Sequence, residues 1–222
     1  MLYLYNAYAG ALSLTLEGDE HRYIFKVRRH KIDDILCLRN LEDTLLYRYR
    51  ITAIDKRTTQ LELQGNESKA VKASTSLHIG WCVIDPKNIE KILPSLNEIG
   101  VEKITFIYCS RSQKSFKIDF KRFEKILLNS SQQSGRSQMM ILEVAKNLED
   151  FLEQYPESKM LHFSENNFVD ETPISTIVVG CEGGFSQSET ALVKADNIVG
   201  FRTALVLKSE SAVCALASKI LL

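Results

Sequence analysis

The sequence predicts an α/β protein in two parts, a small N-terminal β-barrel followed by a layer of alternating strands and helices. Three observations lead to this prediction. Short apolar segments of strand length fill the first seventy residues, strand and helix patterns alternate after Val71, and an apolar segment near residue 180 runs into a glycine-rich loop. The first pattern is typical of small barrels and the second of a largely parallel sheet covered by helices. We therefore expect a barrel domain over residues 1–70 and an α/β domain over residues 71–222.

Five segments of the first part alternate or cluster apolar residues over the length of a strand. They are LYLYNAY, ALSLTL, DILCLRN, LLYRYRITAID and QLELQG, with turn-forming residues at 17–20 and 65–66. The basic segment HRYIFKVRRHK lies between the second and the third. As a strand it would place alternate side chains on opposite faces, so that Arg22, Lys26 and Arg28 share one basic face.

The segment DPKNIEKILPSLNEIG predicts a helix with well-marked ends. Asp85 is suited to the N-cap, Pro86 to the first helical position and Gly100 to the C-terminal stop. Apolar residues recur on one face of this helix, at Ile89, Ile92, Leu93, Leu96 and Ile99.

The remaining segments continue the alternation of strands and helices. A strand KITFIYC is followed by DFKRFEKILLNSSQQSGR, which sets Phe120, Phe123 and Leu127 at helical spacing. The strands KMLHF and STIVVG each end where a polar or glycine-rich loop begins, and SESAVCALASKILL forms the last helix. Loops at the carboxyl ends of parallel strands commonly hold ligands, so we expect the ligand site there.

The stretch VVGCEGGFSQSE places three of the chain's ten glycines within five positions. Gly183 and Gly184 lack a Cβ, so they permit positive φ angles and let backbone N–H groups approach a ligand closely. Ser186 and Glu189 form an S-x-x-E capping box, which predicts a helix at the end of the loop. The stretch matches neither a P-loop nor the spacing GxGxxG. By themselves these residues fit a tight structural turn as well as a ligand site.

The composition favours a globular protein without membrane segments. Of the 222 residues, 45% are apolar and 25% are charged. No run of about 18 apolar residues occurs, and MLYLYNAYAG lacks the basic and apolar blocks of a signal peptide, so we expect a cytoplasmic location. The five cysteines are scattered without a CxxC pair, so we expect reduced thiols and no metal site.

The net charge of zero conceals an uneven distribution along the chain. Residues 1–146 hold 23 Lys and Arg against 17 Asp and Glu, whereas residues 147–222 hold 5 against 11. A basic region of this kind contacts phosphates even in a neutral protein, because binding depends on the local field. A merely solvated surface explains the same composition, so charge alone does not decide between the two interpretations.

Five segments resemble motifs of one family, and they follow one another along the chain in the same order as in that family. VGCEGGFSQSE is similar to I-G-P-E-G-G-[FL]-[ST]-x-x-E of the RsmE family, the small-subunit ribosomal RNA uridine N3-methyltransferases of the SPOUT superfamily. LKSESA resembles its L-R-[TS]-E-T-A, SQQSGR its E-Q-[SC]-x-R, HRYIFKVRRHKIDD its H-x-x-x-V-x-R, and NEIGVEKI its E-[LI]-G-V. The chain departs from the family at Cys181, Gln132 and Lys208, which replace proline, glutamate and arginine, and in the stretch VGFRTALVLKS.

The resemblance implies an N-terminal PUA-like barrel and a C-terminal SPOUT α/β domain with a deep trefoil knot. It implies a homodimer whose substrate is small-subunit ribosomal RNA, either free or within an assembled 30S particle. It also implies S-adenosylmethionine bound among three loops, FSEN, GCEGGFS and VLKSESA. The residues expected to bind this cofactor are Phe163, Ser164, Gly180, Cys181, Glu182, Gly183, Gly184, Gly200, Val206, Leu207, Lys208, Ser209 and Ala212.

Methylation at uridine N3 requires the N3 proton to be shared or lost, so the protein must supply positioning, a general base and charge stabilisation. The candidate catalytic residues are Arg136, Glu182 and Glu210, and the candidate RNA contacts are Arg22, Lys26, Arg28, Arg111 and Arg136. Each catalytic candidate also has a structural explanation. Arg136 fits a charge at the end of a helix, Glu182 a side chain that holds its loop in place, and Glu210 an acidic residue in the first turn of a helix. No covalent cysteine step is needed, so we expect Cys181 to be a packing residue rather than a nucleophile.

Two alternatives remain, a SPOUT methyltransferase acting on another RNA position and a non-catalytic RNA-binding relative. The intact CEGGFS loop favours an enzyme, whereas Lys208 and the altered VGFRTALV favour a relative that has lost methyl transfer. Binding of the methyl donor would separate an enzyme from the non-catalytic relative, and mapping of the modified RNA would separate the two enzymes.

Overall fold

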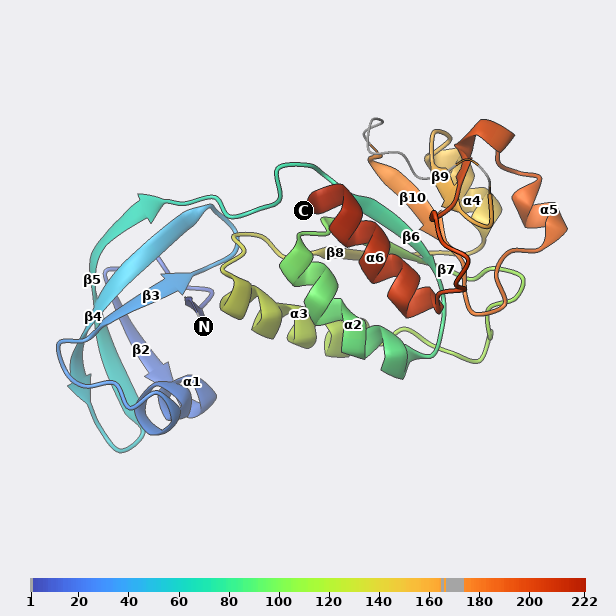
Figure 1. Ribbon diagram of the computed structural model, residues 1–222. Helices are drawn as coiled ribbons and strands as arrows, with labels where there is room; N and C mark the ends of the chain where they lie inside the picture. Colours follow the sequence, from blue (N-terminus) through green and yellow to red (C-terminus); the bar gives the residue numbers. More distant parts are fainter. Residues whose placement is uncertain (1, 165, 167–173) are drawn as a thin grey trace. The chain divides into compact units, whose positions relative to one another are not determined.

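The computed structural model describes residues 2–164, 166 and 174–222, which form two compact units (Figure 1). The first unit comprises Met1–Lys72 and Leu128–Met139, and the second comprises Ala73–Leu127 and Met140–Leu222. This grouping differs from the expected division, which leaves residues 128–139 with the later part of the chain. The backbone N–H of Leu2 donates to the Gln132 carbonyl and that of Tyr5 to the Gln132 side chain, both at 2.8 Å. These bonds attach the segment to the N-terminal strand.

The first unit is built on a five-stranded sheet with the order β1-β3-β4-β5-β2. The pairs β2–β5, β3–β4 and β4–β5 are antiparallel, and β1 runs parallel to β3. All five expected strands are present, and alternate residues of β2 are buried, as the alternating sequence predicts. The strands are β1 (Leu4–Tyr5), β2 (Ser13–Glu17), β3 (Ile35–Arg39), β4 (Leu45–Ile54) and β5 (Thr58–Ser68).

Two parts of the first unit differ from the sequence prediction. Residues 65–66 continue β5, where Gly65 pairs with Arg48, instead of forming a turn. The basic segment after β2 is helical rather than extended, with α1 (Gly18–Arg22) running into a π-helical turn, η1 (Tyr23–Val27). This winding buries both His21 and Ile24, a spacing of three that a helix places on one side and a strand on opposite faces.

The second unit is built on a six-stranded sheet with the order β11-β9-β10-β6-β7-β8, and its described strand pairs are parallel. All five residues of the interior strand β6 are buried. The deep trefoil knot stays a prediction, because strand order alone does not define how a chain threads. The strands are β6 (His78–Cys82), β7 (Lys103–Ile107), β8 (Ile141–Ala145), β9 (Lys159–Leu161), β10 (Thr176–Val179) and β11 (Ile198–Val199).

The helix predicted after β6 is present with the expected ends. Asp85 accepts a hydrogen bond from the Lys87 N–H at 2.9 Å, and Gly100 ends the helix with a φ of 114°. No described helix has both the length and the apolar character needed to cross a membrane. The helices are α2 (Pro86–Ile99), α3 (Phe120–Ser134), α4 (Leu148–Gln154), α5 (Gln187–Thr190) and α6 (Ser209–Leu221), with a 3-10 turn η2 (Ala195–Asn197).

Two of the five cysteines are joined, so the prediction of five reduced thiols is wrong. Cys82 and Cys109 form a disulfide, with their Cα atoms 5.7 Å apart. Cys82 ends β6 and lies in register with Ile107 at the end of the neighbouring strand β7, which brings Cys109 within reach. The two cysteines are 27 positions apart in sequence, so no local spacing signals the pair.

Candidate functional site

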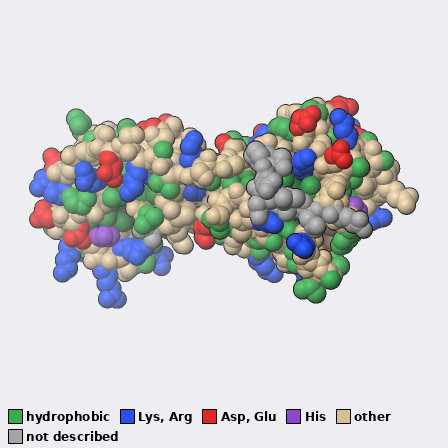
Figure 2. All heavy atoms as spheres, turned by 45° about the horizontal axis from the view of Figure 1, so that its top comes forward, with side chains coloured by type: hydrophobic (Ala, Val, Ile, Leu, Met, Phe, Trp, Pro, Cys, Tyr) green, Lys and Arg blue, Asp and Glu red, His purple; other side chains and the backbone are tan. Residues whose placement is uncertain are grey.

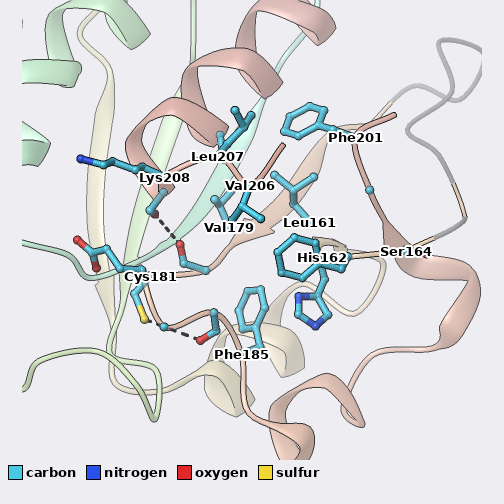
Figure 3. A pocket seen from close by; sticks show the side chains of 18 of the residues that line it. Leu161, His162, Ser164, Val179, Cys181, Phe185, Phe201, Val206, Leu207 and Lys208 are labelled. Carbon is cyan, nitrogen blue, oxygen red and sulfur yellow. Dashed lines mark hydrogen bonds between the residues drawn. The ribbon is translucent and has the colours of Figure 1, made fainter. Parts of the chain in front are cut away.

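Three segments at the carboxyl ends of parallel strands line one cavity of about 570 Å³ (Figure 3). They are the loop after β9, the glycine loop (residues 180–185) after β10, and residues 200–209, which run from the end of β11 into α6. These strands are neighbours in the sheet, so segments far apart in sequence come together at one edge.

Every residue that the resemblance places at the methyl donor lies in the lining of this cavity. They are Phe163, Ser164, Gly180, Cys181, Glu182, Gly183, Gly184, Gly200, Val206, Leu207, Lys208, Ser209 and Ala212. Of the FSEN loop, Glu165 lies outside the described residues. The structure thus brings the set together, while the role of these residues in binding stays a prediction.

Two glycines of the cavity are needed for steric reasons. Gly184 has a φ of 66°, a value that side chains with a Cβ rarely adopt, and its N–H donates to the Cys181 carbonyl at 2.9 Å. A Cβ added to Gly200 would lie only 2.8 Å from the Ser164 carbonyl oxygen. Gly183 does not have the positive φ that the sequence suggests, and a Cβ there would instead meet the Arg111 side chain at 3.2 Å.

Two linked hydrogen bonds tie the glycine loop to α6 and β6. The Ser209 hydroxyl, in the first turn of α6, donates to the Gly180 carbonyl at 2.5 Å. The indole N–H of Trp81, on β6, donates to the same hydroxyl at 2.9 Å. Cys181 is buried with its Sγ 3.8 Å from the Gly184 carbonyl oxygen, and its role as a packing residue stays a prediction.

Apolar side chains form much of the cavity wall. Figure 3 shows Leu161, Val206 and Phe201 near one another, with the Lys208 side chain pointing away from them. The rings of His162 and Phe185 are nearly perpendicular, with their centroids 6.0 Å apart. Burial lowers the pKa of His162 and the positive charge of Arg111 lowers it further, so the imidazole is neutral near pH 7.

The sequence prediction missed part of this lining. Leu161 and Val179 are the last residues of their strands, and His162 and Phe185 lie in the loops that follow. Their positions at the carboxyl ends of strands were the sequence signal by which they could have been assigned to the cavity. The other missed residues lie in VGFRTALVLKS, the stretch that departs from the family motif. The missed residues are Leu161, His162, Val179, Phe201, Thr203 and Leu205, and Phe185 lies in the expected loop GCEGGFS without having been named as a binding residue.

The three candidate catalytic residues belong to different units, Arg136 to the first and both Glu182 and Glu210 to the second. Glu182 lines the cavity and is exposed. Glu210 lies outside the lining, and its Oε2 is buried with no hydrogen-bond partner among the described residues. Arg136 is buried within the first unit, and its Nε donates to the Gln138 carbonyl at 3.3 Å.

Three expected RNA contacts of the first unit, Arg22, Lys26 and Arg28, are exposed, but on a helical segment instead of a strand, whereas Arg136 is buried. Figure 2 shows Lys and Arg side chains projecting from this unit. Arg22 and Lys26 are four positions apart, so helical winding keeps them on nearly the same side. Arg28 donates to the Tyr23 hydroxyl at 2.6 Å, with its guanidinium 5.5 Å from the Tyr23 ring centroid.

Comparison with known proteins agrees with this architecture. An RNA methyltransferase domain model matches residues 71–221, and an RNA methyltransferase PUA domain model matches residues 16–64. Ribosomal RNA small subunit methyltransferase E of Helicobacter pylori is 39% identical over 98% of both chains.

Two solved structures share the fold along nearly the whole chain. A methyltransferase from Legionella pneumophila, in complex with S-adenosylmethionine, has a TM-score of 0.81 at 20% identity and covers 99% of this chain and 96% of its own. Ribosomal RNA small subunit methyltransferase E from Neisseria gonorrhoeae, bound to the same molecule, has a TM-score of 0.80 at 16% identity, with 98% and 95% covered. The PUA-like unit, the α/β unit and these matches together show that the chain belongs to the RNA methyltransferase family of ribosomal RNA small subunit methyltransferase E.

Proposed function

We propose that this chain transfers a methyl group from S-adenosylmethionine to N3 of a specific uridine in small-subunit (16S) ribosomal RNA. One observation carries the proposal. All thirteen residues that the family resemblance places at the methyl donor line a single cavity at the carboxyl ends of parallel strands.

The residues of the cavity fit this cofactor, which combines a flat aromatic base with a polar ribose and a charged amino-acid portion. Leu161, Val206 and Leu207 offer apolar surface for the base. The absent Cβ of Gly200 and the positive φ of Gly184 leave backbone groups open to close approach by the polar portions. When bound, the cofactor supplies a methyl group on a positively charged sulfur, which is activated for displacement.

The chain itself must then orient the uracil and accept the N3 proton. Glu182 is an exposed carboxylate on the cavity lining, which makes it our first candidate for the general base. Arg136 and Glu210 are retained as candidates that act on the substrate, although neither lines the cavity. Because the imidazole of His162 is neutral, Arg111 and Lys208 are the cationic side chains of the described lining.

The two units divide the work in this proposal. The basic residues Arg22, Lys26 and Arg28 of the first unit, together with Arg111, contact phosphates of the RNA, and the second unit performs the transfer. The active form is a homodimer in the cytoplasm, and its substrate is the small-subunit RNA, free or within the assembled 30S particle.

The decisive experiment compares small-subunit RNA from cells with and without the protein, by nuclease digestion and mass spectrometry. Loss of one 3-methyluridine, restored by incubation with purified protein and S-adenosylmethionine, supports the proposal. Loss of a different methylated nucleotide would point to another RNA position. Unchanged RNA, with no calorimetric binding of S-adenosylmethionine to the purified protein, would identify a non-catalytic relative.

A further inference from the structure

The carboxylate of Glu189 connects two loops that are far apart in sequence. Its Oε1 accepts from the Ser110 backbone N–H at 2.7 Å, and its Oε2 accepts from the Ser110 hydroxyl at 2.7 Å. The same Oε2 accepts from the Ser186 N–H at 2.9 Å, which completes the capping box of α5 predicted from the sequence. Glu189 is only 5% exposed, so these bonds replace its contacts with water.

The loop reached through Ser110 touches the glycine loop at a second point. Arg111, the next residue, donates from Nη1 to the Gly183 carbonyl at 2.6 Å. Its side chain also packs against Gly183, since a Cβ built there would lie 3.2 Å from the Arg111 Cβ. The Cα of Arg111 is one peptide unit from that of Ser110, so a shift of Ser110 also moves Arg111. The hydrogen bond and the packing contact between Arg111 and Gly183 would then change.

We propose that Glu189 is a positioning residue for the methyl donor, which holds the glycine loop in its binding shape by fixing Ser110 and, through it, Arg111. Glu189 does not line the cavity, so it acts on the donor only through these neighbours. The inference rests on the proposed function, because donor affinity is its main readout.

A carboxylate is required at this position, and the isosteric amide cannot replace it. Oε1 and Oε2 each face a backbone N–H, of Ser110 and of Ser186 respectively. A glutamine side chain has one acceptor and one NH₂ group, so in either orientation the NH₂ group faces a backbone donor. One of these two N–H groups then loses its partner, and the two loops separate.

The disulfide provides an independent anchor for the same segment. Cys109, adjacent to Ser110, is bonded to Cys82 at the end of β6. The chain therefore stays attached to the sheet when the Glu189 bonds are lost, and the expected change is confined to Ser110, Arg111 and the glycine loop. This makes Glu189→Gln a variant that should fold.

The test is a double-mutant cycle on calorimetric affinity for S-adenosylmethionine, with the variants Glu189→Gln, Arg111→Ala and both together. We expect Glu189→Gln to weaken donor binding about tenfold. In the Arg111→Ala background the same change should weaken it by less than about threefold, because the route through Arg111 is already lost. At saturating donor, kcat on RNA should change less than KM for the donor. Fully additive losses would overturn the proposal.

Asp150→Asn is the matched control, because Asp150 is an exposed carboxylate in the first turn of α4. It should leave donor affinity unchanged. Ser110→Ala removes one hydroxyl bond only and should give an intermediate loss if Glu189→Gln proves too unstable to purify.

Hydrogen exchange without donor separates this inference from the proposed function. Glu189→Gln should speed exchange at the amides of Ser110 and Ser186, with Asp150→Asn unchanged. Normal exchange at Ser110 in the variant would refute the link between the loops. A third outcome is faster exchange in the variant together with a wild-type protein that binds no S-adenosylmethionine. This outcome would keep the link between the loops but refute the proposed function, and with it the role of Glu189 in donor binding.

Discussion

Gly184 and Gly18 allow the backbone requirement of the cavity to be measured against a matched position. Their φ angles are 66° and 55°, and a Cβ built on either meets nothing within 4 Å. The two glycines thus share the same strain on substitution and differ in location, since Gly184 lines the cavity and Gly18 begins α1.

We predict that Gly184→Ala and Gly18→Ala each lower the free energy of unfolding by about 1 kcal/mol, the cost of a left-handed residue with a Cβ. Only Gly184→Ala should also weaken calorimetric binding of S-adenosylmethionine, by about tenfold. Equal donor affinity in the two variants would remove the glycine loop from the donor site.

Glu189 gives a prediction for pH. Burial raises the pKa of its carboxyl, but hydrogen bonds from Ser186 and Ser110 outweigh burial, and the net pKa is lowered from its ordinary value of 4.5. A lowered pKa in the folded state means stabilisation that is present above the unfolded-state pKa and is lost as pH falls through the folded-state pKa. The difference in free energy of unfolding between wild type and Glu189→Gln should therefore be constant above about pH 5 and shrink at lower pH. Urea unfolding from pH 3 to 7 measures it, and a constant difference throughout would contradict the assignment.

The helix α2 shows how far local sequence signals determine an element. Its cap, first proline and terminating glycine all lie where the sequence places them, because each satisfies a local backbone requirement. Ile89, Leu93 and Leu96 of the predicted apolar face are fully buried. Elements with such local signals are therefore predictable without knowledge of the fold.

Removal of the α2 cap should have a defined cost. Asp85→Ala leaves the Lys87 N–H without its partner at 2.9 Å, and we expect a loss of about 1 kcal/mol in the free energy of unfolding. Asp85→Asn keeps an acceptor and should lose much less. Chemical denaturation of the three proteins checks both values, and similar losses for the two variants would show that the cap bond is unimportant.

Segments without local signals were predicted less well. The segment of α1 and η1 interleaves basic with aromatic residues, a pattern that fits a strand. In the helical form His21 is buried beside Thr59, 38 positions away, a contact that has no local signal in the sequence. The same limit applies to the cavity. Motif residues could be named from the sequence, but the contacts Ser110–Glu189 and Arg111–Gly183 join positions 79 and 72 apart and follow only from the order of the strands.

Three basic residues expected to contact RNA and the cavity expected to hold the methyl donor lie in different units. Arg22, Lys26 and Arg28 are exposed on the first unit, whereas the cavity belongs to the second. If the first unit supplies RNA affinity, then its basic residues control the salt dependence of binding without affecting the donor.

Changing Arg22, Lys26 and Arg28 together to glutamate should weaken RNA binding and make the slope of log affinity against log salt shallower, because fewer counterions are released. Calorimetric affinity for S-adenosylmethionine should not change. Lys117, Lys121 and Lys125, exposed on the second unit, provide a control triple of equal charge change. An equal loss from the control triple would place the RNA elsewhere, and a parallel loss of donor binding would indicate unfolding.

The first unit is discontinuous in sequence, and this has a consequence for how the protein is made. Residues 128–139 belong to it, and the Gln132 carbonyl and side chain bond to the backbone of Leu2 and Tyr5. On the ribosome the N-terminal strand can pair with β3 early, but its bonds to Gln132 form only after β6, α2, β7 and most of α3 have been made. An N-terminal fragment ending at Lys72 would lack these bonds, so full protection of β1 from protease should first appear in nascent chains long enough for residues 128–139 to have left the ribosome.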